Sequence, residues 1–142
     1  MNTWILAANG SCARLFKVAT TGGLEEIEDF TNPANRQHER DLTSDRYGRA
    51  MSSASGHSES YQEPSVRQRE QESFARELGE RLEKALRNHE FDSLYLVCGP
   101  RFIGLLRKHL HPSVVSAVKL EVHKNLATHP LQEIRAHLPE RL

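Results

Sequence analysis

Residues 4–19 read WILAANGSCARLFKVA, which is two apolar runs rich in strand-forming residues on either side of Asn9-Gly10. Asn-Gly is the dipeptide best suited to the positive φ angles of a tight hairpin turn. The stretch therefore predicts an antiparallel β-hairpin at the start of the chain. After turn-forming residues at 20–23, a third and weaker strand is indicated by Leu24, Ile27 and Phe30.

Farther along the chain, the next strand signal is the apolar run LYLVC at residues 94–98. A nearly continuous apolar run is typical of a central strand that is buried on both faces. Gly99-Pro100 ends this strand. A short helix is predicted after it, with an apolar side formed by Phe102, Leu105, Leu106 and Leu110.

The C-terminal part of the chain adds a helical turn from Pro112 to Val118 and a strand at residues 120–123. Thr128 is then expected to cap a final helix, with Pro130 in its first turn, where proline is tolerated. The residues of this helix that are expected to face inward are Leu131, Ile134 and Leu138.

A long helix is predicted from Ser65 to His89. Ser65 and Gln68 form a capping-box pattern, and apolar residues recur every four residues behind it, at Phe74, Leu78, Leu82 and Leu86. The other faces carry interleaved charges, such as Glu77 with Arg81, and are expected to be exposed to solvent.

The predicted order of elements is three strands, a long loop, and then helix, strand, helix, strand and helix. An antiparallel meander whose first strand continues into a parallel βαβ half gives an α/β fold, with a mixed sheet covered by helices in three layers. Ribonuclease H-like folds have this arrangement. A chain of 142 residues has room for one core, so we expect a single domain over residues 1–142.

Residues 31–64 form a polar segment without periodic apolar residues. Insertions of this length in a compact domain are usually functional or disordered. The loop and the first half of the long helix contain arginines suited to gripping phosphate groups, at Arg36, Arg40, Arg46, Arg49, Arg67, Arg69 and Arg76. The alternative is a solvated loop, because acidic residues within it nearly cancel this charge.

The chain as a whole has no electrostatic bias, because 19 Lys and Arg residues balance 19 Asp and Glu residues. Attraction to nucleic acid must therefore come from a local patch. The N-terminus has no basic leader, and no stretch approaches the roughly 20 apolar residues that span a bilayer. We expect a cytoplasmic protein that does not associate with membranes, in which Cys12 and Cys98 are structural thiols.

The remaining polar residues show no pattern of a known catalytic or cofactor site. His109 and His111 are closely spaced, but no Cys or carboxylate lies at an interval diagnostic of zinc, so we expect helix-end histidines and no metal. No Gly-x-Ser-x-Gly elbow or glycine-rich nucleotide cradle occurs, so no cofactor is expected. His57 is a candidate for proton transfer, but the prediction is against catalysis by it and favours a binding protein over an enzyme.

Four stretches occur in a characteristic order and spacing: NGSCARLF at 9–16, FAREL at 74–78, GPRFIGLLR at 99–107 and LATHP at 126–130. On these stretches the chain resembles the bacterial host attachment protein family over nearly its whole length. The family is in turn similar to the middle domain of archaeal and eukaryotic peptide-chain release factors, which has the same order of strands and helices.

In release factors a Gly-Gly-Gln loop leads into an arginine-rich helix and promotes hydrolysis of peptidyl-tRNA in the ribosome. The helix start VRQRE at residues 66–70 is similar to that helix, and Phe74 follows at a matching distance. The chain has no Gly-Gly-Gln, since the loop glycines Gly48 and Gly56 are each isolated and Gln62 follows neither of them directly. Those glycines let the backbone approach the ester bond closely, so the resemblance implies docking to RNA rather than hydrolysis.

The leading hypothesis is a translation-associated protein that contacts ribosomal RNA or a tRNA acceptor end, so a ribosome or tRNA is the expected partner. Its candidate contacts are the seven arginines named above and Gln62. The second hypothesis is an interaction or regulatory protein connected with attachment to host cells. The third is a hydrolase of peptidyl-tRNA that uses His57.

Overall fold

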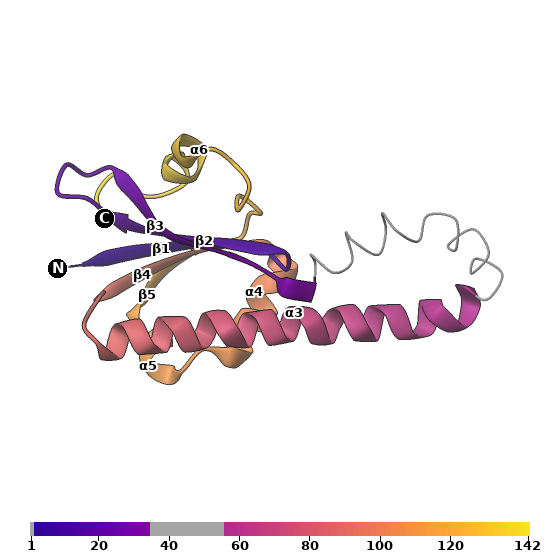
Figure 1. The fold of residues 1–142 in the computed structure, drawn as a ribbon. Coiled ribbons are helices and arrows are strands. Elements are labelled where there is room, and N and C mark those ends of the chain that lie inside the picture. Colours follow the sequence, from indigo (N-terminus) through magenta and orange to yellow (C-terminus); the bar gives the residue numbers. More distant parts are fainter. Residues whose placement is uncertain (1, 35–55) are drawn as a thin grey trace.

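The computed structural model describes residues 2–34 and 56–142, with the side chains of the second range from residue 66 onward (Figure 1). Its strands and longer helices are β1 (Thr3–Ala8), β2 (Cys12–Val18), β3 (Leu24–Thr31), α3 (Gly56–Arg87), β4 (Ser93–Cys98), α4 (Pro100–His109), α5 (Pro112–Ala117), β5 (Val118–Val122) and α6 (Leu131–Ala136). They follow one another in the order that the sequence predicts.

The strands of the described residues form one mixed sheet in the order β3-β2-β1-β4-β5. β1 pairs antiparallel with β2, and β2 with β3, whereas the β1–β4 and β4–β5 pairs are parallel. The predicted α/β fold with a meander and a parallel half is therefore confirmed. The assignment to ribonuclease H-like folds stays a prediction.

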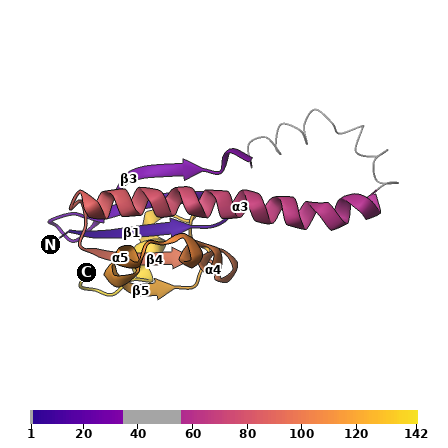
Figure 2. The ribbon, with the colours of Figure 1, turned by 90° about the horizontal axis from the view of Figure 1, so that it is seen from below.

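Helices cover both faces of the sheet, so the fold has three layers (Figures 1 and 2). α3, α4 and α5 pack on one face together with Trp4 and Leu6 of β1, and α6 packs on the other face with Ile5 and Ala7. Successive side chains of a strand point to opposite faces. β1 therefore contributes to both halves of the core, which explains why all of its residues are buried.

The long helix begins earlier than predicted, because α3 starts at Gly56 and not at Ser65. Residues 56–64 therefore belong to a helix and not to a loop. The apolar period that predicted the helix marks only the part that packs on the sheet, whereas the upstream turns extend beyond the sheet and carry no such period (Figure 1). The rest of the predicted loop, residues 35–55, lies outside the described residues.

The turn between β1 and β2 differs from the predicted turn with positive φ angles, since neither Asn9 nor Gly10 has a positive φ. The Asn9 side chain closes the turn instead. Its Oδ1 accepts hydrogen bonds from the backbone N–H groups of Ser11 and Cys12, at 2.8 and 2.9 Å. Asparagine was thus the right turn residue for a different reason, which is the capacity of its side chain to accept backbone hydrogen bonds.

β3 contains a bulge that the sequence did not predict. Glu26 and Glu28 pair with successive residues of β2, so Ile27 between them has no partner and is exposed. The extra residue turns the strand, and Leu24 and Phe30 consequently pack on opposite faces of the sheet. The predicted third strand is confirmed, but its apolar residues do not share one face.

The last helix starts later than predicted, because Pro130 and not Thr128 precedes the first residue of α6, and no side chain caps it. The carbonyl groups of Ala127 and His129 accept hydrogen bonds from Arg14 of β2, which holds this segment against the sheet before the helix begins. The residues predicted to face inward are buried or partly buried: Leu131, Ile134 and Leu138.

Candidate functional site

One end of the sheet gathers the carboxyl ends of the parallel strands. Asn9 follows β1, Gly99 follows β4 and Asn125 comes shortly after β5. α4 begins at this end, and α3 passes it at Arg67 to Gln71. In open α/β sheets, ligands bind outside the carboxyl ends of the strands, where neighbouring connections diverge.

A cavity of about 860 Å³ lies at this end. Its polar lining consists of two arginines and four carboxamide side chains: Asn9, Arg67, Gln68, Gln71, Arg101 and Asn125. Among the described residues, no carboxylate contributes to the lining. We call this hollow the strand-end cavity.

Asn9 and Asn125 are hydrogen-bonded to each other in the wall of the strand-end cavity. Because Asn9 Oδ1 already accepts two backbone N–H groups, its Nδ2 is the group that donates to Asn125 Oδ1, at 3.0 Å. This network fixes which end of the Asn125 carboxamide is oxygen and which is nitrogen. The Asn125 NH₂ group has no acceptor among the described residues and therefore keeps two hydrogens for a ligand.

α4 begins at the cavity with Gly99 as its N-cap and Pro100 at its first position. Proline is favoured there, because the first N–H groups of a helix have no acceptor within the helix. No side chain caps α4, and its first turn has no acidic residue. The free N–H groups of this turn and the positive end of the helix dipole therefore add to the attraction for an anion.

The two arginines of the cavity come from different elements, Arg67 from α3 and Arg101 from the first turn of α4. Both are exposed, and neither forms an ion pair with a carboxylate of the described residues. A guanidinium group can bind two oxygens of a phosphate at once. The arrangement is suited to binding an anionic group.

Close packing holds α3 against the turn between β1 and β2. A Cβ atom on Gly10 would lie 2.5 Å from Nε2 at the end of the Gln71 side chain, so a larger residue at this position would force that side chain to move. The buried Asn32 joins the two, because its Nδ2 donates to the carbonyl oxygens of Gly10 at 3.0 Å and Glu70 at 3.4 Å. These contacts fix the wall from which Gln71 lines the cavity.

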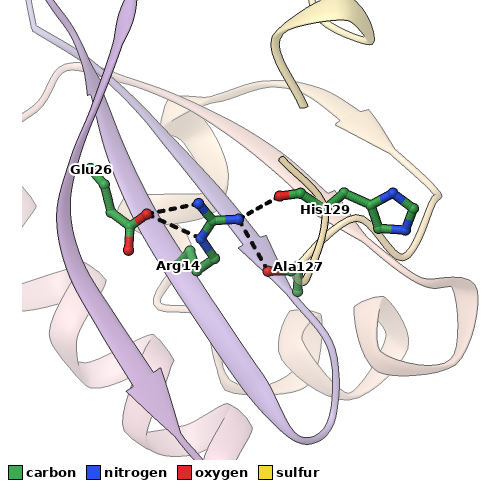
Figure 3. A network of polar contacts seen from close by, with 4 residues as sticks. All are labelled: Arg14, Glu26, Ala127 and His129. Atoms are coloured by element: carbon green, nitrogen blue, oxygen red, sulfur yellow. Dashed lines mark hydrogen bonds and ion pairs between the residues drawn. The ribbon is translucent and has the colours of Figure 1, made fainter. Parts of the chain in front are cut away.

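Arg14 of β2 fastens the segment after β5 to the sheet (Figure 3). Its Nε and Nη2 donate to Glu26 Oε1 at 3.1 and 2.8 Å, and its Nη1 donates to the carbonyl oxygens of His129 at 2.6 Å and Ala127 at 3.5 Å. The first and last of the four stretches that carry the family resemblance meet through this arginine. Arg14 has a structural role, since it holds in place the segment that follows Asn125.

The sequence predicted part of this site. Arg67 lines the strand-end cavity, whereas Arg69 and Arg76 are exposed on α3 outside its lining. His57 was expected in a loop but lies in α3, and its side chain and that of Gln62 are outside the described part. The other predicted contacts also lie outside the described residues: Arg36, Arg40, Arg46 and Arg49.

Sequence reasoning missed Asn9, Arg101 and Asn125 as site residues. Each comes after a predicted strand, and the carboxyl ends of parallel strands meet at one edge of a sheet. Asn9 and Arg101 stand in two of the stretches that carry the family resemblance. The position of these residues after strands therefore indicated the site, but the polar loop and its arginines gave a stronger pattern.

His109 and His111, the two closely spaced histidines, contact polar groups of the protein. His109 Nε2 lies 3.0 Å from Glu72 Oε1, and His111 caps α5 by accepting a hydrogen bond from the backbone N–H of Ser113. Both are helix-end histidines, as predicted. In the described ranges, no three His, Cys, Asp or Glu side chains are grouped so that they could hold a metal ion.

Cys12 and Cys98 are both free thiols. Burial raises the pKa of Cys98 to about 12, so this thiol stays protonated and is a poor nucleophile. None of the helices in the described part of the chain is long and apolar enough to cross a membrane.

A family profile described as a protein required for attachment to host cells matches residues 4–138. The chain belongs to this family. The match confirms the resemblance to the host attachment protein family, and every polar residue of the strand-end cavity falls within it. No curated protein matches the chain. The further likeness to release-factor middle domains stays a prediction.

Proposed function

We propose that this member of the host attachment protein family is a cytoplasmic, translation-associated protein that binds RNA of the ribosome or of tRNA. The observation that supports the proposal is the convergence of Arg67 and Arg101 on a cavity that has no carboxylate in its described lining. The net charge of the chain is zero, so affinity for phosphates has to come from such a local arrangement. The sequence resemblance to release factors suggests the ribosome as partner.

Two further arginines of α3 are exposed. Arg69 and Arg76 belong to the same helix that supplies Arg67 to the cavity, but they lie on the opposite side of it, because successive residues are about 100° apart around a helix. They would contact the phosphate backbone of an RNA that passes from the cavity around the helix. The other contacts that the sequence predicts, Gln62 and the four loop arginines, have side chains that lie outside the described part of the chain.

Co-sedimentation with ribosomes at moderate salt tests the proposal. A variant with Arg46, Arg49, Arg67 and Arg69 changed to Gln should lose at least about tenfold in affinity, because each lost phosphate contact lowers binding. The matched control changes four exposed cations elsewhere, Arg87, Lys108, Lys119 and Arg141, to Gln. The control should sediment like the parent. Equal sedimentation of all three proteins would overturn the proposal.

A second candidate function is an interaction or regulatory protein that acts in attachment to host cells. The description of the matching family favours it. Fractionation of cells would distinguish the two candidates, since a protein found mainly on the cell surface has little access to ribosomes. Recovery in the ribosome-containing fraction would favour RNA binding.

A further inference from the structure

We propose that the strand-end cavity binds one unstacked nucleotide of a single-stranded RNA. In this arrangement its phosphate lies at Arg67 and Arg101, and its base or sugar lies at Asn125 and Gln71. The inference rests on the proposed RNA-binding function and assigns it a ligand and a site. It follows from the chemistry of the lining, from the size of the cavity and from its position.

The charged side chains of the cavity offer hydrogen-bond donors and no acceptors. Arg67 and Arg101 can only donate, and the Asn125 NH₂ group is left as a donor because Asn9 occupies the oxygen of that side chain. A phosphate, which carries negative charge and several acceptor oxygens, satisfies both guanidinium groups, and a carboxylate in the lining would repel it. An acceptor atom of the neighbouring base or sugar satisfies the Asn125 NH₂ group.

A phosphate group alone would leave much of the cavity lining without a ligand contact. Gln68 and Gln71 add carboxamides, each of which can both donate and accept hydrogen bonds, and Phe102 and Pro100 add apolar surface. Carboxamides pair with base edges, and apolar surface accepts the face of a base. A nucleotide supplies the phosphate, the hydrogen-bonding edge and the apolar face together.

The size of the cavity also suits a single nucleotide. The cavity of about 860 Å³ lies within the range of roughly 300–1,000 Å³ that is usual for sites that bind one small ligand. A nucleotide therefore fits, whereas a duplex would have to lie across the opening. Sequence-specific recognition of RNA is directed mainly at unstacked bases in single strands, for the same reason of access.

The variant Asn125→Asp separates the two roles of this side chain. The aspartate keeps an oxygen that accepts the hydrogen bond from Asn9, so the wall should remain intact. It replaces the NH₂ donor by a second oxygen and adds a negative charge beside the phosphate position. The matched control is Asn88→Asp, which makes the same change at an exposed residue after the end of α3.

The probe is a fluorescein-labelled single-stranded RNA of mixed sequence, measured by fluorescence anisotropy. Asn125→Asp and Arg101→Gln should each weaken binding about tenfold, and Asn88→Asp should change it less than twofold. A nucleoside 5′-monophosphate should displace the RNA at lower concentration than inorganic phosphate does. It should also shift the ¹⁵N side-chain amide signal of Asn125, which is identified by its absence in Asn125→Asp.

Three results would overturn the inference: equal RNA binding by the parent and Asn125→Asp, equal displacement by inorganic phosphate and nucleotide, or no binding of either RNA or nucleotide. The proposed function is judged separately by ribosome sedimentation. Sedimentation that depends on the arginines of α3, together with RNA binding that ignores Asn125→Asp, would leave the function standing and remove this site. Nucleotide binding without ribosome association would leave this site standing and remove the proposed function.

Discussion

The two ends of β1 use arginine in opposite ways. At the amino end, a cavity of about 410 Å³ contains Arg81, whose Nε lies 3.0 Å from Glu28 Oε1 and whose Nη2 lies 3.9 Å from Glu90 Oε1. The same guanidinium group lies 5.5 Å from the ring centre of Trp4. At the carboxyl end, Arg67 and Arg101 line the larger cavity without a carboxylate partner among the described residues.

The difference shows that the partners of an arginine, and not the number of arginines, indicate a binding surface. The sequence placed Arg81 beside Glu77 on a solvated helix face. In the structure Arg81 is half-buried and bound to Glu28, which was not predicted because β3 is distant in sequence. A guanidinium group whose charge is already neutralised by a carboxylate binds a ligand weakly. A guanidinium group without such a partner, at the edge of a cavity, can bind an anion.

The largest expected effect tests the rigidity of α3, on which both Arg67 and Arg81 lie. A Cβ atom on Gly79 would lie 2.3 Å from the carbonyl oxygen of His109 at the end of α4, and a backbone atom cannot give way cheaply. We expect Gly79→Ala to lower the free energy of unfolding in urea by about 3 kcal/mol.

Gly104→Ala is the control for this change. It also adds a methyl group to a helix, but nothing lies within 4 Å of the new Cβ. It should raise stability by up to about 1 kcal/mol, because alanine favours helix more than glycine does. If Gly79→Ala were as stable as the parent, α3 would not be fixed against α4, and the comparison of its two arginines would lose its basis.

The next prediction contrasts the two arginines directly. Arg81→Ala removes two ion pairs and a cation–π contact from partly exposed positions, and should lower the free energy of unfolding by about 1 kcal/mol. Arg67→Ala should change it by less than about 0.5 kcal/mol, which is usual for a surface substitution. RNA affinity should fall more in Arg67→Ala than in Arg81→Ala. A larger loss of stability in Arg67→Ala would contradict its assignment to a ligand surface.

The smallest expected effect concerns the pair of Arg107 and Glu121. Arg107 has a carboxylate partner, as Arg81 does, but is exposed, as Arg67 is. The hydrogen bond from Arg107 lowers the pKa of Glu121 below its usual value. A depressed carboxyl pKa stabilises the fold above the usual Glu pKa of about 4.3 and loses this effect as the pH falls through the lower, folded value. Glu121→Gln should cost about 0.5 kcal/mol at pH 6 and less at pH 3.

Urea denaturation at both pH values measures this difference, and Glu80→Gln on the exposed side of α3 is the control. The control should show no change between the two pH values beyond that of the parent. A penalty for Glu121→Gln that grew toward low pH would reverse the sign and contradict the assignment of the lowered pKa to the folded state.

The fold could be predicted well where local patterns carry tertiary information. The apolar run at residues 4–8 correctly indicated a strand, the run at 94–98 correctly indicated a central strand, and the four-residue period from Phe74 indicated the packed part of α3. The start of α3 and the bulge at Ile27 could not be predicted in this way. A solvated helix turn needs no apolar period, and a bulge depends on the partner strand.

The sequence by itself determined which elements form, because strand and helix periods follow from side-chain geometry, and it placed several arginines on the long helix. Only the tertiary structure decided that four separate segments line one cavity, through Asn9, Arg67, Arg101 and Asn125. It also decided that Arg14 is bound to the segment after β5 and Arg81 to Glu28 of β3. The physical reason is that a charge acts on what lies within a few ångströms of it. Neighbours at that range are fixed by the pairing of strands and the packing of helices, which no local stretch of sequence contains.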